Sequence, residues 1–336
     1  MSTVLEVENL AIEIPISAGQ LHPVRGISFH VDRGETLAIV GESGCGKSLT
    51  SLAVMGLLPS AAIRHADKMD FQGDAMDGFS EAQMSDIRGN RMSMIFQDPM
   101  TSLNPTYTIG NQLEEVMLRH KNVSRREARD RAIYLLEKVG ITGAASRLKQ
   151  YPHQLSGGLR QRVMIAMALM CDPELLIADE PTTALDVTIQ AQILLLIAQI
   201  QKEFNIGVIL ITHDLGVVAR VADRVAVMYA GRIVESGTGK EVFEKPLHPY
   251  TQGLMDCIPI PGKTEPGQHL GSIPGIVPTL VGDLSGCMFR ERCPFAHDGC
   301  REEPQDQQMG PGRAYQCNLP SDIDQRQRTG ALEAAQ

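Results

Sequence analysis

The sequence predicts an α/β fold in which helices cover a largely parallel sheet. Short apolar runs at Thr36–Val40, Leu175–Ala178 and Val208–Thr212 have the length and composition of buried strands. Between these runs, stretches such as Gln190–Phe204 space their apolar residues as helices do. Strands that alternate with helices form parallel sheets whose faces are covered. The third observation is a glycine-rich segment, residues 41–48, directly after the first run.

The glycine-rich segment has the spacing of a phosphate-binding loop, G-x-x-x-x-G-K-S. It lies between an apolar strand and a helical stretch, Leu49–Leu58, which is the context that such a loop requires. Glycines let successive N–H groups approach a phosphate, and the helix dipole favours an anion. Lys47 would neutralise phosphate charge, and Ser48 would offer a hydroxyl to Mg²⁺. A glycine-rich turn with a chance Lys-Ser is the alternative, and the flanking strand and helix disfavour it. We therefore expect the chain to bind a nucleoside triphosphate through Gly41, Glu42, Ser43, Gly44, Cys45, Gly46, Lys47, Ser48 and Leu49.

Composition argues against several classes of protein. The chain has 336 residues, which suggests about two domains, and 43% apolar residues, enough for a real core. No apolar stretch reaches membrane-spanning length, and no secretion signal is visible, so the chain is expected to stay in the cytosol. A net charge of −9 argues against a general nucleic-acid binder. Seven cysteines in that compartment should not form structural disulfides.

The first hundred residues are predicted to contain mostly strands. Residues 4–14 and 24–31 alternate apolar and polar side chains and lead into the strand at 36–40. Residues 59–90 are polar and mixed, with a weak strand signal at 69–71. A short apolar strand follows at Met92–Gln97 and ends in a lone glutamine.

Helical spacing dominates from residue 111 to 150, and Ser124-Arg-Arg-Glu127 has the pattern of a capping box. Residues 225–229 and 232–235 resemble a hairpin that closes around Ala230-Gly231. After about residue 240, proline and glycine become dense, which predicts a second, loop-rich unit over 241–320. Residues 321–336 are predicted to be a disordered tail.

Acidic residues follow the apolar run that begins at Leu175. Asp179 would lie at the carboxyl end of a strand, where open α/β sheets bind ligands, and would hold Mg²⁺ together with Ser48. Glu180 is placed to orient the attacking water or to accept its proton. His213, after another apolar run, is a candidate to touch the γ-phosphate or the water. A solvated acidic turn is the alternative, and the phosphate-binding loop makes it the poorer explanation.

A second anion site is expected where Ser156, Gly157 and Gly158 open an apolar helix. One chain then carries two half-sites for phosphate. The simplest way to use both is a head-to-tail pair of cassettes, each closing on the nucleotide of the other, so that ATP holds the pair closed and hydrolysis releases it.

In this order, the motifs resemble the ATP-binding cassette of ABC transporters over roughly residues 4–240. They are Gly41–Ser48, Gln97, Leu155–Gly158, Asp179-Glu180, Ala184-Leu185-Asp186 and His213. The resemblance implies a P-loop NTPase with a RecA-like core, an antiparallel β-subdomain and a helical subdomain at about 100–170. It implies that the chain is an ATPase.

The resemblance also implies roles for single residues. Gln97 would sense Mg²⁺ and γ-phosphate and contact the membrane partner, Ser156–Gly158 would bind ATP in trans, and Asp186 would couple the two sites. Glu180 and His213 would act in hydrolysis. Two positions depart from the family pattern. Leu159 stands where many cassettes have Gln, and Ile14 stands where an aromatic residue usually stacks on adenine, so we assign no adenine-stacking residue.

Four of the seven cysteines, Cys287, Cys293, Cys300 and Cys317, lie in one late segment as C-x5-C-x6-C-x16-C. Four thiolates suit Zn²⁺ or an iron–sulfur cluster. Structural zinc favours pairs with about two to four residues between ligands, which this spacing lacks. The open spacing and Cys293-Pro294 favour a [4Fe–4S] cluster, with zinc or unligated thiols as alternatives.

The segment after residue 240 resembles that of one particular group of ABC transporter ATPases. Lys245–Thr251, Ile273–Pro278 and the cysteine run resemble the C-terminal extension of oligopeptide and dipeptide importer ATPases, as do Gln97–Pro105 and Tyr151–Leu155. Such a subunit implies two permeases, a second homologous cassette ATPase and a periplasmic or lipid-anchored solute-binding protein, at the cytoplasmic face of a bacterial inner membrane. Importers of nickel, glutathione and opines share the subfamily and remain alternatives. A soluble ABC ATPase without a transport role is a further one.

Overall fold

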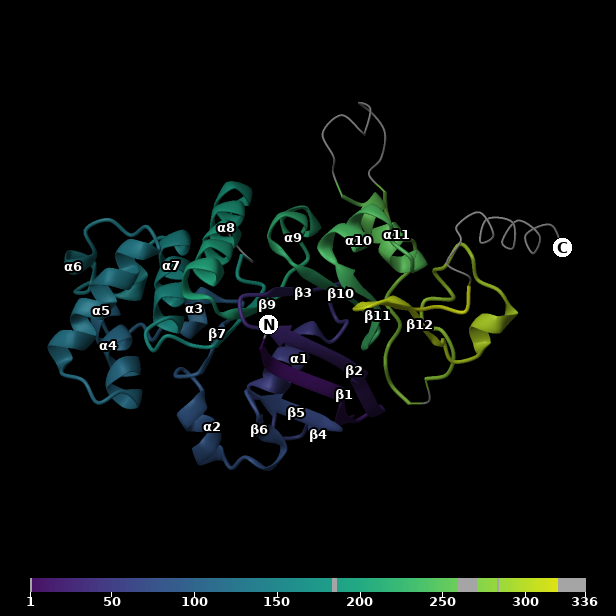
Figure 1. The fold of residues 1–336 in the computed structure, drawn as a ribbon, viewed down its shortest axis with the longest axis horizontal. Coiled ribbons are helices and arrows are strands. Elements are labelled where there is room, and N and C mark those ends of the chain that lie inside the picture. Colours follow the sequence, from purple (N-terminus) through teal and green to yellow (C-terminus); the bar gives the residue numbers. More distant parts are fainter. Residues whose placement is uncertain (1, 183–185, 259–270, 283, 320–336) are drawn as a thin grey trace.

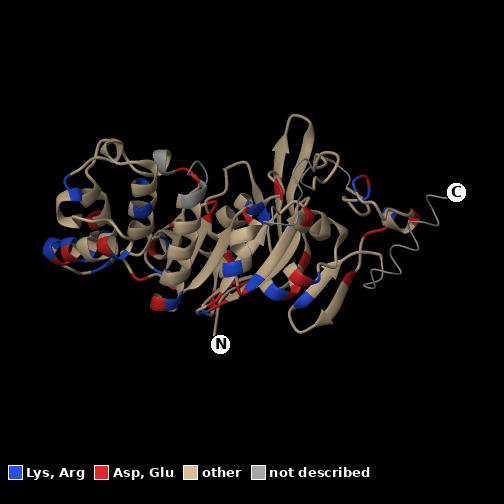
Figure 2. Ribbon diagram, turned by 90° about the horizontal axis from the view of Figure 1, so that it is seen from above, with Lys and Arg blue, Asp and Glu red and all other residues tan. Residues whose placement is uncertain are grey.

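The computed structural model describes residues 2–182, 186–258, 271–282 and 284–319. Two sheets form its centre, a bundle of helices lies at one end, and the segment after residue 240 lies at the other (Figure 1). Figure 2 shows Lys and Arg interspersed with Asp and Glu in all three regions. Among the described helices, none has the length and apolarity needed to cross a bilayer.

The smaller sheet is antiparallel and is built mainly from the N-terminal residues. Its strands are β1 (Thr3–Ile16), β2 (Gly19–Asp32), β4 (Ile63–His65), β5 (Lys68–Phe71) and β6 (Asp74–Ala75), followed by the short helices η1 (Met76–Gly78) and α2 (Glu81–Ile87). Alternating burial along β1 and β2 places Leu5, Val7, Ile27 and Phe29 in the core, as the alternation in the sequence predicts. Residues 59–90, which show only a weak strand signal, contribute β4, β5 and β6 by pairing with β1 and with one another.

The larger sheet has the strand order β12-β13-β11-β10-β3-β9-β8-β7. Its parallel part consists of β10 (Arg224–Tyr229), β3 (Thr36–Val40), β9 (Gly207–Ile211), β8 (Leu175–Asp179) and β7 (Met92–Ile95). Residues of β3, β8 and β9 are buried throughout, as expected of continuous apolar runs between two covered faces. The register pairs Ile39 with Ile211 and Asp179 with Ile211, so the carboxyl ends of β3, β8 and β9 lie at one edge of the sheet.

Helices cover both faces of this sheet. On one face lie α8 (Val187–Phe204), α9 (Leu215–Val221) and α10 (Gly239–Glu244), and on the other lie α1 (Lys47–Val54) and the antiparallel sheet (Figure 1). Helix α1 is shorter than the predicted Leu49–Leu58, because Gly56 adopts a φ of +63° and ends it. The predicted turn at Ala230-Gly231 is confirmed, with both residues at positive φ between β10 and β11 (Arg232–Thr238).

The helical bundle has its own core. It contains α3 (Pro99–Ser102), α4 (Ile109–His120), α5 (Arg125–Lys138), α6 (Ala144–Arg147), η2 (Pro152–Gln154) and α7 (Gly157–Ala168). Leu113, Leu136 and Ile165 pack in one cluster that continues to α8 through Leu194. The capping box predicted at Ser124 is confirmed, because the Ser124 side chain accepts from the Glu127 N–H and the Glu127 carboxylate accepts from the Ser124 N–H.

The extension after residue 240, predicted as a second, loop-rich unit, also contains regular secondary structure. Besides α11 (Pro249–Asp256) and η3 (Asp298–Arg301), this extension forms a hairpin of β12 (Asp306–Gly310) and β13 (Arg313–Gln316). Strand β13 pairs antiparallel with β11, so the extension adds two antiparallel strands to the central sheet, beside a β11 strand that is itself antiparallel to β10. The predicted tail at 321–336 lies outside the described residues.

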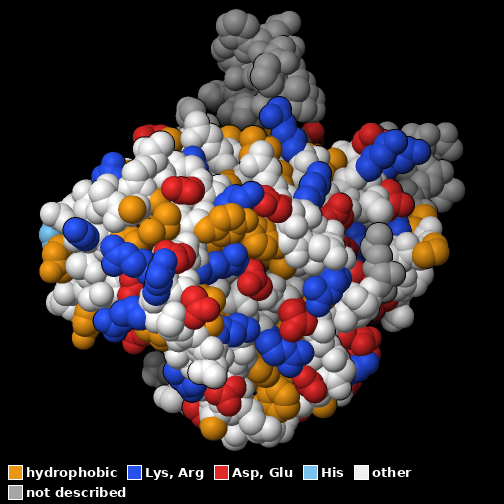
Figure 3. Space-filling view, turned by 60° about the vertical axis from the view of Figure 1, so that its left-hand side comes forward, with side chains coloured by type: hydrophobic (Ala, Val, Ile, Leu, Met, Phe, Trp, Pro, Cys, Tyr) orange, Lys and Arg blue, Asp and Glu red, His pale blue; other side chains and the backbone are white. Residues whose placement is uncertain are grey.

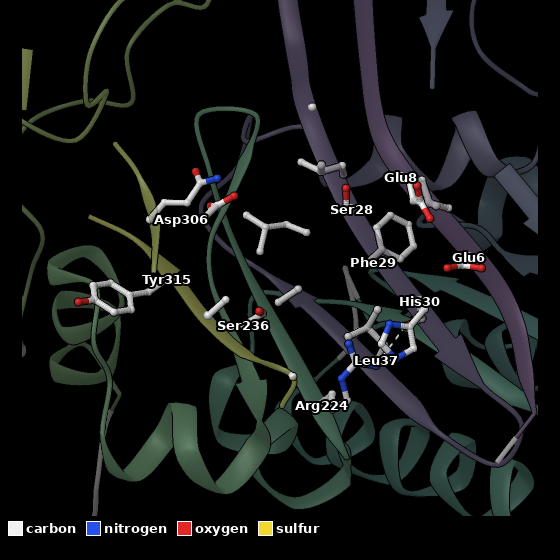
Figure 4. A pocket seen from close by; sticks show the side chains of 18 of the residues that line it. Glu6, Glu8, Ser28, Phe29, His30, Leu37, Arg224, Ser236, Asp306 and Tyr315 are labelled. Carbon is white, nitrogen blue, oxygen red and sulfur yellow. Dashed lines mark hydrogen bonds between the residues drawn. The ribbon is translucent and has the colours of Figure 1, made fainter. Parts of the chain in front are cut away.

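A cavity of about 360 Å³ lies where the extension meets the antiparallel sheet. Figure 4 shows Glu6, Ser28 and His30 on one wall and Ser236 and Asp306 on the other. Arg224 closes one end, where its Nη1 lies 3.0 Å from His30 Nε2 and donates to Glu35 Oε1 at 3.0 Å. The extension is therefore packed against both sheets.

Candidate nucleotide site

The predicted phosphate-binding loop connects β3 to α1. Gly46 is the N-cap of α1 with φ +97°, and a Cβ at this position would lie 2.1 Å from the Pro23 carbonyl oxygen. Gly41 is equally confined, since its Cβ would lie 2.1 Å from the Met228 carbonyl oxygen. These two positions therefore accept only glycine. Beside Gly44, by contrast, the space is open.

Lys47, the first residue of α1, points back over the loop. Its side chain is buried, and its ammonium donates to the carbonyl oxygens of Gly41 and Glu42, at 2.9 Å each. A buried cation whose neighbours are carbonyl dipoles is suited to receive an anion, because a phosphate would supply the opposite charge that these dipoles only partly replace.

Two carboxylates follow β8 at the same edge of the sheet. Asp179 is buried and accepts a hydrogen bond from Ser48 Oγ at 2.9 Å. Burial raises the pKa of the Asp179 carboxyl, the Ser48 hydrogen bond opposes this, and the nearby Glu180 charge adds to it. A hydroxyl and a carboxylate beside a phosphate-binding loop are oxygen ligands of the kind that Mg²⁺ prefers.

Glu180 has an unusual backbone, with φ +43°, and its N–H donates to the Ile211 carbonyl at 2.8 Å. Its Oε2 accepts a hydrogen bond from Gln97 Nε2 at 3.1 Å and lies 3.7 Å from His213 Nδ1. Three predicted residues from three different strand ends therefore meet at one carboxylate oxygen.

A cavity of about 370 Å³ joins the loop to this cluster. Its lining includes nine of the predicted residues, and one that sequence reasoning missed, Pro23 of β2, which carries no motif. The lining residues are Pro23, Ser43, Gly44, Gly46, Lys47, Ser48, Leu49, Gln97, Glu180 and His213. The arrangement can bind a polyphosphate at the loop and hold a water near Glu180.

Other predicted residues lie outside this cavity. Cys45 is fully buried beneath the loop, and the Glu42 side chain turns away to Arg292. Ser156 and Gly157 are exposed at the start of α7, and Asp186 is exposed at the start of α8. Ala184 and Leu185 lie outside the described residues. Within one chain, the second predicted anion site therefore does not contribute to the cavity around Lys47.

The four late cysteines lie in the extension. Burial raises the pKa of the Cys287 thiol to about 11 and that of Cys293 to about 12, and the neighbouring thiols of the four contribute to both shifts. Within the described part of the chain, no three or more His, Cys, Asp or Glu side chains are arranged so that they could hold a metal ion. The structure thus gives no support to a preformed iron–sulfur or zinc site.

A groove of about 1070 Å³ lies between the central sheet and the helical bundle. Phe96 and Tyr107 are 41% and 53% exposed there, and Met94 and Met167 extend the apolar lining. Ser93 Oγ is buried in the lining with no hydrogen-bond partner among the described residues. Figure 3 shows the side of the molecule that carries the helical bundle, with hydrophobic side chains in patches bordered by charged residues of both signs. Large exposed apolar side chains in a groove are typical of an interaction surface.

Comparisons with solved structures agree with this fold. A dimeric ATP-binding cassette in a post-hydrolysis state, bound to ADP and Pi, matches with a TM-score of 0.62 at 24% identity, over 70% of this chain and 98% of its own. The cassette cbiO1 from Clostridium perfringens, part of an ABC transporter complex, matches with a TM-score of 0.62 at 33% identity, over 73% and 93%. The architecture is that of an ATP-binding cassette.

Two family patterns match the sequence, "ABC transporter" over residues 24–183 and "Oligopeptide/dipeptide transporter, C-terminal region" over residues 234–300. The dipeptide transport ATP-binding protein DppD of Bacillus subtilis is 54% identical over 88% of both chains. The oligopeptide transport ATP-binding protein AppD of the same organism is 51% identical over 95% of this chain and 97% of its own, and DppD of Escherichia coli is 47% identical over 95% and 97%. The chain belongs to the ABC transporter family, and within it to the ATP-binding proteins of oligopeptide and dipeptide transport. It is an ATPase of this family.

Proposed function

We propose that the chain hydrolyses ATP to drive the import of dipeptides and oligopeptides through a membrane complex. The observation that carries this proposal is the identity of 54% with a dipeptide transport ATP-binding protein over 88% of both chains. Residues 234–300 also match the family pattern described as "Oligopeptide/dipeptide transporter, C-terminal region". Nickel, glutathione and opine import have no comparable observation in their favour.

The geometry supports distinct roles for the residues around the cavity. The loop from Gly41 to Leu49 would bind the phosphates of ATP, with the Lys47 ammonium held by the carbonyls of Gly41 and Glu42 and donating to a phosphate oxygen. Ser48, Asp179 and Gln97 would hold Mg²⁺, which would neutralise charge on the transferred phosphate.

Hydrolysis would centre on Glu180. Its carboxylate would orient the attacking water and accept its proton, with His213 beside it to contact the γ-phosphate. Glu180 Oε2 accepts a hydrogen bond from Gln97 Nε2 at 3.1 Å. A contact with ATP or Mg²⁺ that draws Gln97 away would free this oxygen for the water.

We assign Ser156, Gly157, Gly158 and Asp186 to the nucleotide of a second, homologous cassette. Ser156 caps no backbone group of its own helix with its side chain, although it opens α7. A free hydroxyl and free N–H groups at a helix N-terminus suit a phosphate supplied by a partner.

The groove beside Phe96 and Tyr107 is proposed as the docking site of a permease. Two permeases, a second cassette and a solute-binding protein would complete the importer, with this chain at the cytoplasmic face of the membrane. The exposed apolar residues of the groove favour its burial against a partner, and Ser93 Oγ offers that partner a hydrogen bond.

We also propose domain bounds for the chain: the cassette spans residues 1–240, with its helical subdomain at about 100–170, and the extension spans 241–320.

We also propose that Cys287, Cys293, Cys300 and Cys317 take up a [4Fe–4S] cluster, after rotation of their side chains. Support comes from ligand number and spacing and from backbone N–H groups that reach the sulfurs, such as Leu319 N–H at 3.5 Å from Cys317 Sγ. Iron and sulfide analysis of protein purified without oxygen should give about four of each per chain. Stoichiometric zinc, or no metal at all, would overturn this assignment.

Purification of the tagged chain from gently solubilised native membranes tests the transport proposal. The expected partners are two multi-span permeases, a second cassette and a peptide-binding protein. After reconstitution, a dipeptide should stimulate ATP hydrolysis and enter vesicles only when ATP is present. Recovery of the chain alone, or a complex stimulated by nickel but by no peptide, would contradict the proposal.

A further inference from the structure

An arginine of the C-terminal extension reaches the phosphate-binding loop. Arg292 Nη1 lies 2.7 Å from Glu42 Oε2, and Arg292 Nη2 lies 2.9 Å from Glu42 Oε1, so the guanidinium and the carboxylate form a two-pronged pair. The Arg292 side chain is only 4% exposed. Since a bidentate pair fixes both distance and orientation, it holds Glu42 in one place.

The extension also fixes the guanidinium itself. Arg292 Nε donates to the Pro274 carbonyl at 2.8 Å, and the guanidinium lies 5.7 Å and 5.9 Å from the ring centroids of Tyr229 and Phe289. Glu42 and the Tyr229 hydroxyl raise the pKa of Arg292, against the opposing effect of burial, so its charge is retained. These partners hold the Arg292 side chain in a single orientation.

A second residue of the extension holds the backbone at the same position. The hydroxyl of Tyr250, which is fully buried, accepts a hydrogen bond from the Glu42 N–H at 2.9 Å. Tyr250 packs at 4.5 Å between ring centroids on Tyr229 and at 5.5 Å on Phe289. Glu42 is thus held through its side chain by Arg292 and through its backbone by Tyr250.

Glu42 in turn contacts the lysine of the loop. Its carbonyl oxygen accepts a hydrogen bond from Lys47 Nζ at 2.9 Å. Gly41, the residue before Glu42, lies so close to the Met228 carbonyl that the loop cannot shift in that direction. A displacement of Glu42 would therefore move the carbonyl oxygen that holds the Lys47 ammonium in position.

We propose that Arg292 and Tyr250 are positioning residues for ATP: they brace the phosphate-binding loop from the side opposite the nucleotide. The segment between Cys287 and Cys293, which carries Arg292, thereby sets the affinity of the site. A loop already in its bound conformation binds more tightly, because less order must be imposed when the ligand arrives. This inference rests on the proposed assignment of Gly41–Ser48 to the phosphates of ATP.

Steady-state hydrolysis by the assembled complex tests the proposal. Arg292→Gln should raise KM for ATP about tenfold and change kcat by less than about threefold, because Arg292 affects loop placement and touches no reacting atom. Tyr250→Phe, which keeps the ring and removes the acceptor, should raise KM about threefold. Arg292→Lys keeps the positive charge but cannot form the two parallel hydrogen bonds of a guanidinium, so its affinity for ATP should lie between those of Arg292→Gln and wild type.

The extension provides a matched control. Arg313 forms a comparable buried pair, with Nη2 2.7 Å from Glu235 Oε1 and side chains 7% and 0% exposed, but it contacts Glu235 and Lys245 and no loop residue. Arg313→Gln should lower the melting temperature as Arg292→Gln does and leave KM unchanged. If Arg313→Gln raises KM equally, or Arg292→Gln leaves it within twofold of wild type at a temperature where both are folded, the proposal fails.

A double variant separates coupling from general damage. Glu42→Gln combined with Arg292→Gln should raise KM no further than Arg292→Gln alone, whereas independent residues would give multiplied effects. Lys47→Ala distinguishes failure of the underlying assignment. If that variant binds a fluorescent ATP analogue as wild type does, the loop is not the phosphate site. If it loses binding while Arg292→Gln retains full affinity, only the bracing role is refuted.

Discussion

At the scale of single residues, Glu180 stands out because it is held in a backbone conformation that few non-glycine residues adopt. A φ of +43° costs about 1 kcal/mol or more for a residue with a side chain, and the hydrogen bond from the Glu180 N–H to Ile211 maintains it. This turn directs the carboxylate to the edge of the sheet, where Gln97 and His213 meet it. Strain at this position is consistent with a chemical role rather than a structural one.

Glu180→Gln should abolish turnover and preserve ATP binding, because the amide keeps the size of the side chain and cannot accept a proton. Loss of a general base lowers kcat by about 10² to 10⁴-fold. Phosphate release and binding of a fluorescent ATP analogue measure the two properties separately. Glu137→Gln, at an exposed position of α5, serves as the control with normal turnover. Hydrolysis by Glu180→Gln at more than a tenth of the wild-type rate would exclude Glu180 as the base.

Sequence reasoning located most of the residues that line this cavity, because G-x-x-x-x-G-K-S and the Asp-Glu pair are local patterns. It missed Pro23, Tyr250 and Arg292. Arg292 lies 250 positions from Glu42, and nothing near either residue marks the pair. Contacts across such separations arise from the packing of the extension on the sheet, which a single sequence does not encode in any periodic pattern.

At the scale of elements, the end of α8 shows how one residue terminates a helix. Asn205 follows Phe204 in a left-handed conformation with φ +50°, and its N–H donates to the Gln201 carbonyl. Asparagine and glycine tolerate this conformation better than other residues. The next strand, β9, begins two residues later, so the termination positions a central strand.

Asn205→Ala should lower the free energy of unfolding by about 1 kcal/mol, whereas Asn205→Gly should change it by only a few tenths. The physical reason is steric, since the alanine Cβ disfavours positive φ. Urea unfolding followed by circular dichroism measures both variants. An equal loss in the two would show that the side chain of Asn205, which lies beside Gly34, matters more than its backbone.

Elements with a strong local pattern were predicted well, and those that depend on a neighbour were not. The strand Thr36–Val40 has the predicted bounds, and the capping box at Ser124 is present. The strand Asp306–Gly310 has the sequence Asp-Gln-Gln-Met-Gly, which lacks alternation and β-branched residues, and it forms only by pairing with β13. The formation of this strand therefore depends on its pairing with β13 and not on the strand propensity of its own residues.

At the scale of the whole molecule, the chain contains two predicted phosphate-binding features, and only one of them lines the cavity around Lys47. Ser156 is exposed, and it is absent from the lining of the cavity that contains Lys47. The proposed pair of cassettes would bring them together across an interface. Binding by one chain and hydrolysis by the pair should then respond differently to changes at Ser156.

Ser156→Arg should leave ATP affinity of the isolated chain unchanged and reduce hydrolysis by the assembled complex at least about tenfold, because a bulky cation would displace the partner's nucleotide from the helix N-terminus. The fold should tolerate the change, since the Ser156 side chain makes no capping hydrogen bond. Nucleotide titration of the isolated chain and phosphate release by the complex are the two measurements. Equal losses in both would place Ser156 in its own chain's site.

The hairpin that the extension adds to the central sheet also decides what the sheet presents to its surroundings. Without β12 and β13, the backbone of β11 would offer a row of unpaired N–H and C=O groups next to buried Val234 and Glu235. With them, the outermost strand is β12, which is short and largely exposed and contains one Asp and two Gln among its five residues. Such a strand is a poor template for pairing with another chain. We therefore expect a cassette cut off before the extension to expose the β11 edge, to aggregate more readily than the full chain, and to lose the contacts of Arg292 and Tyr250 with Glu42.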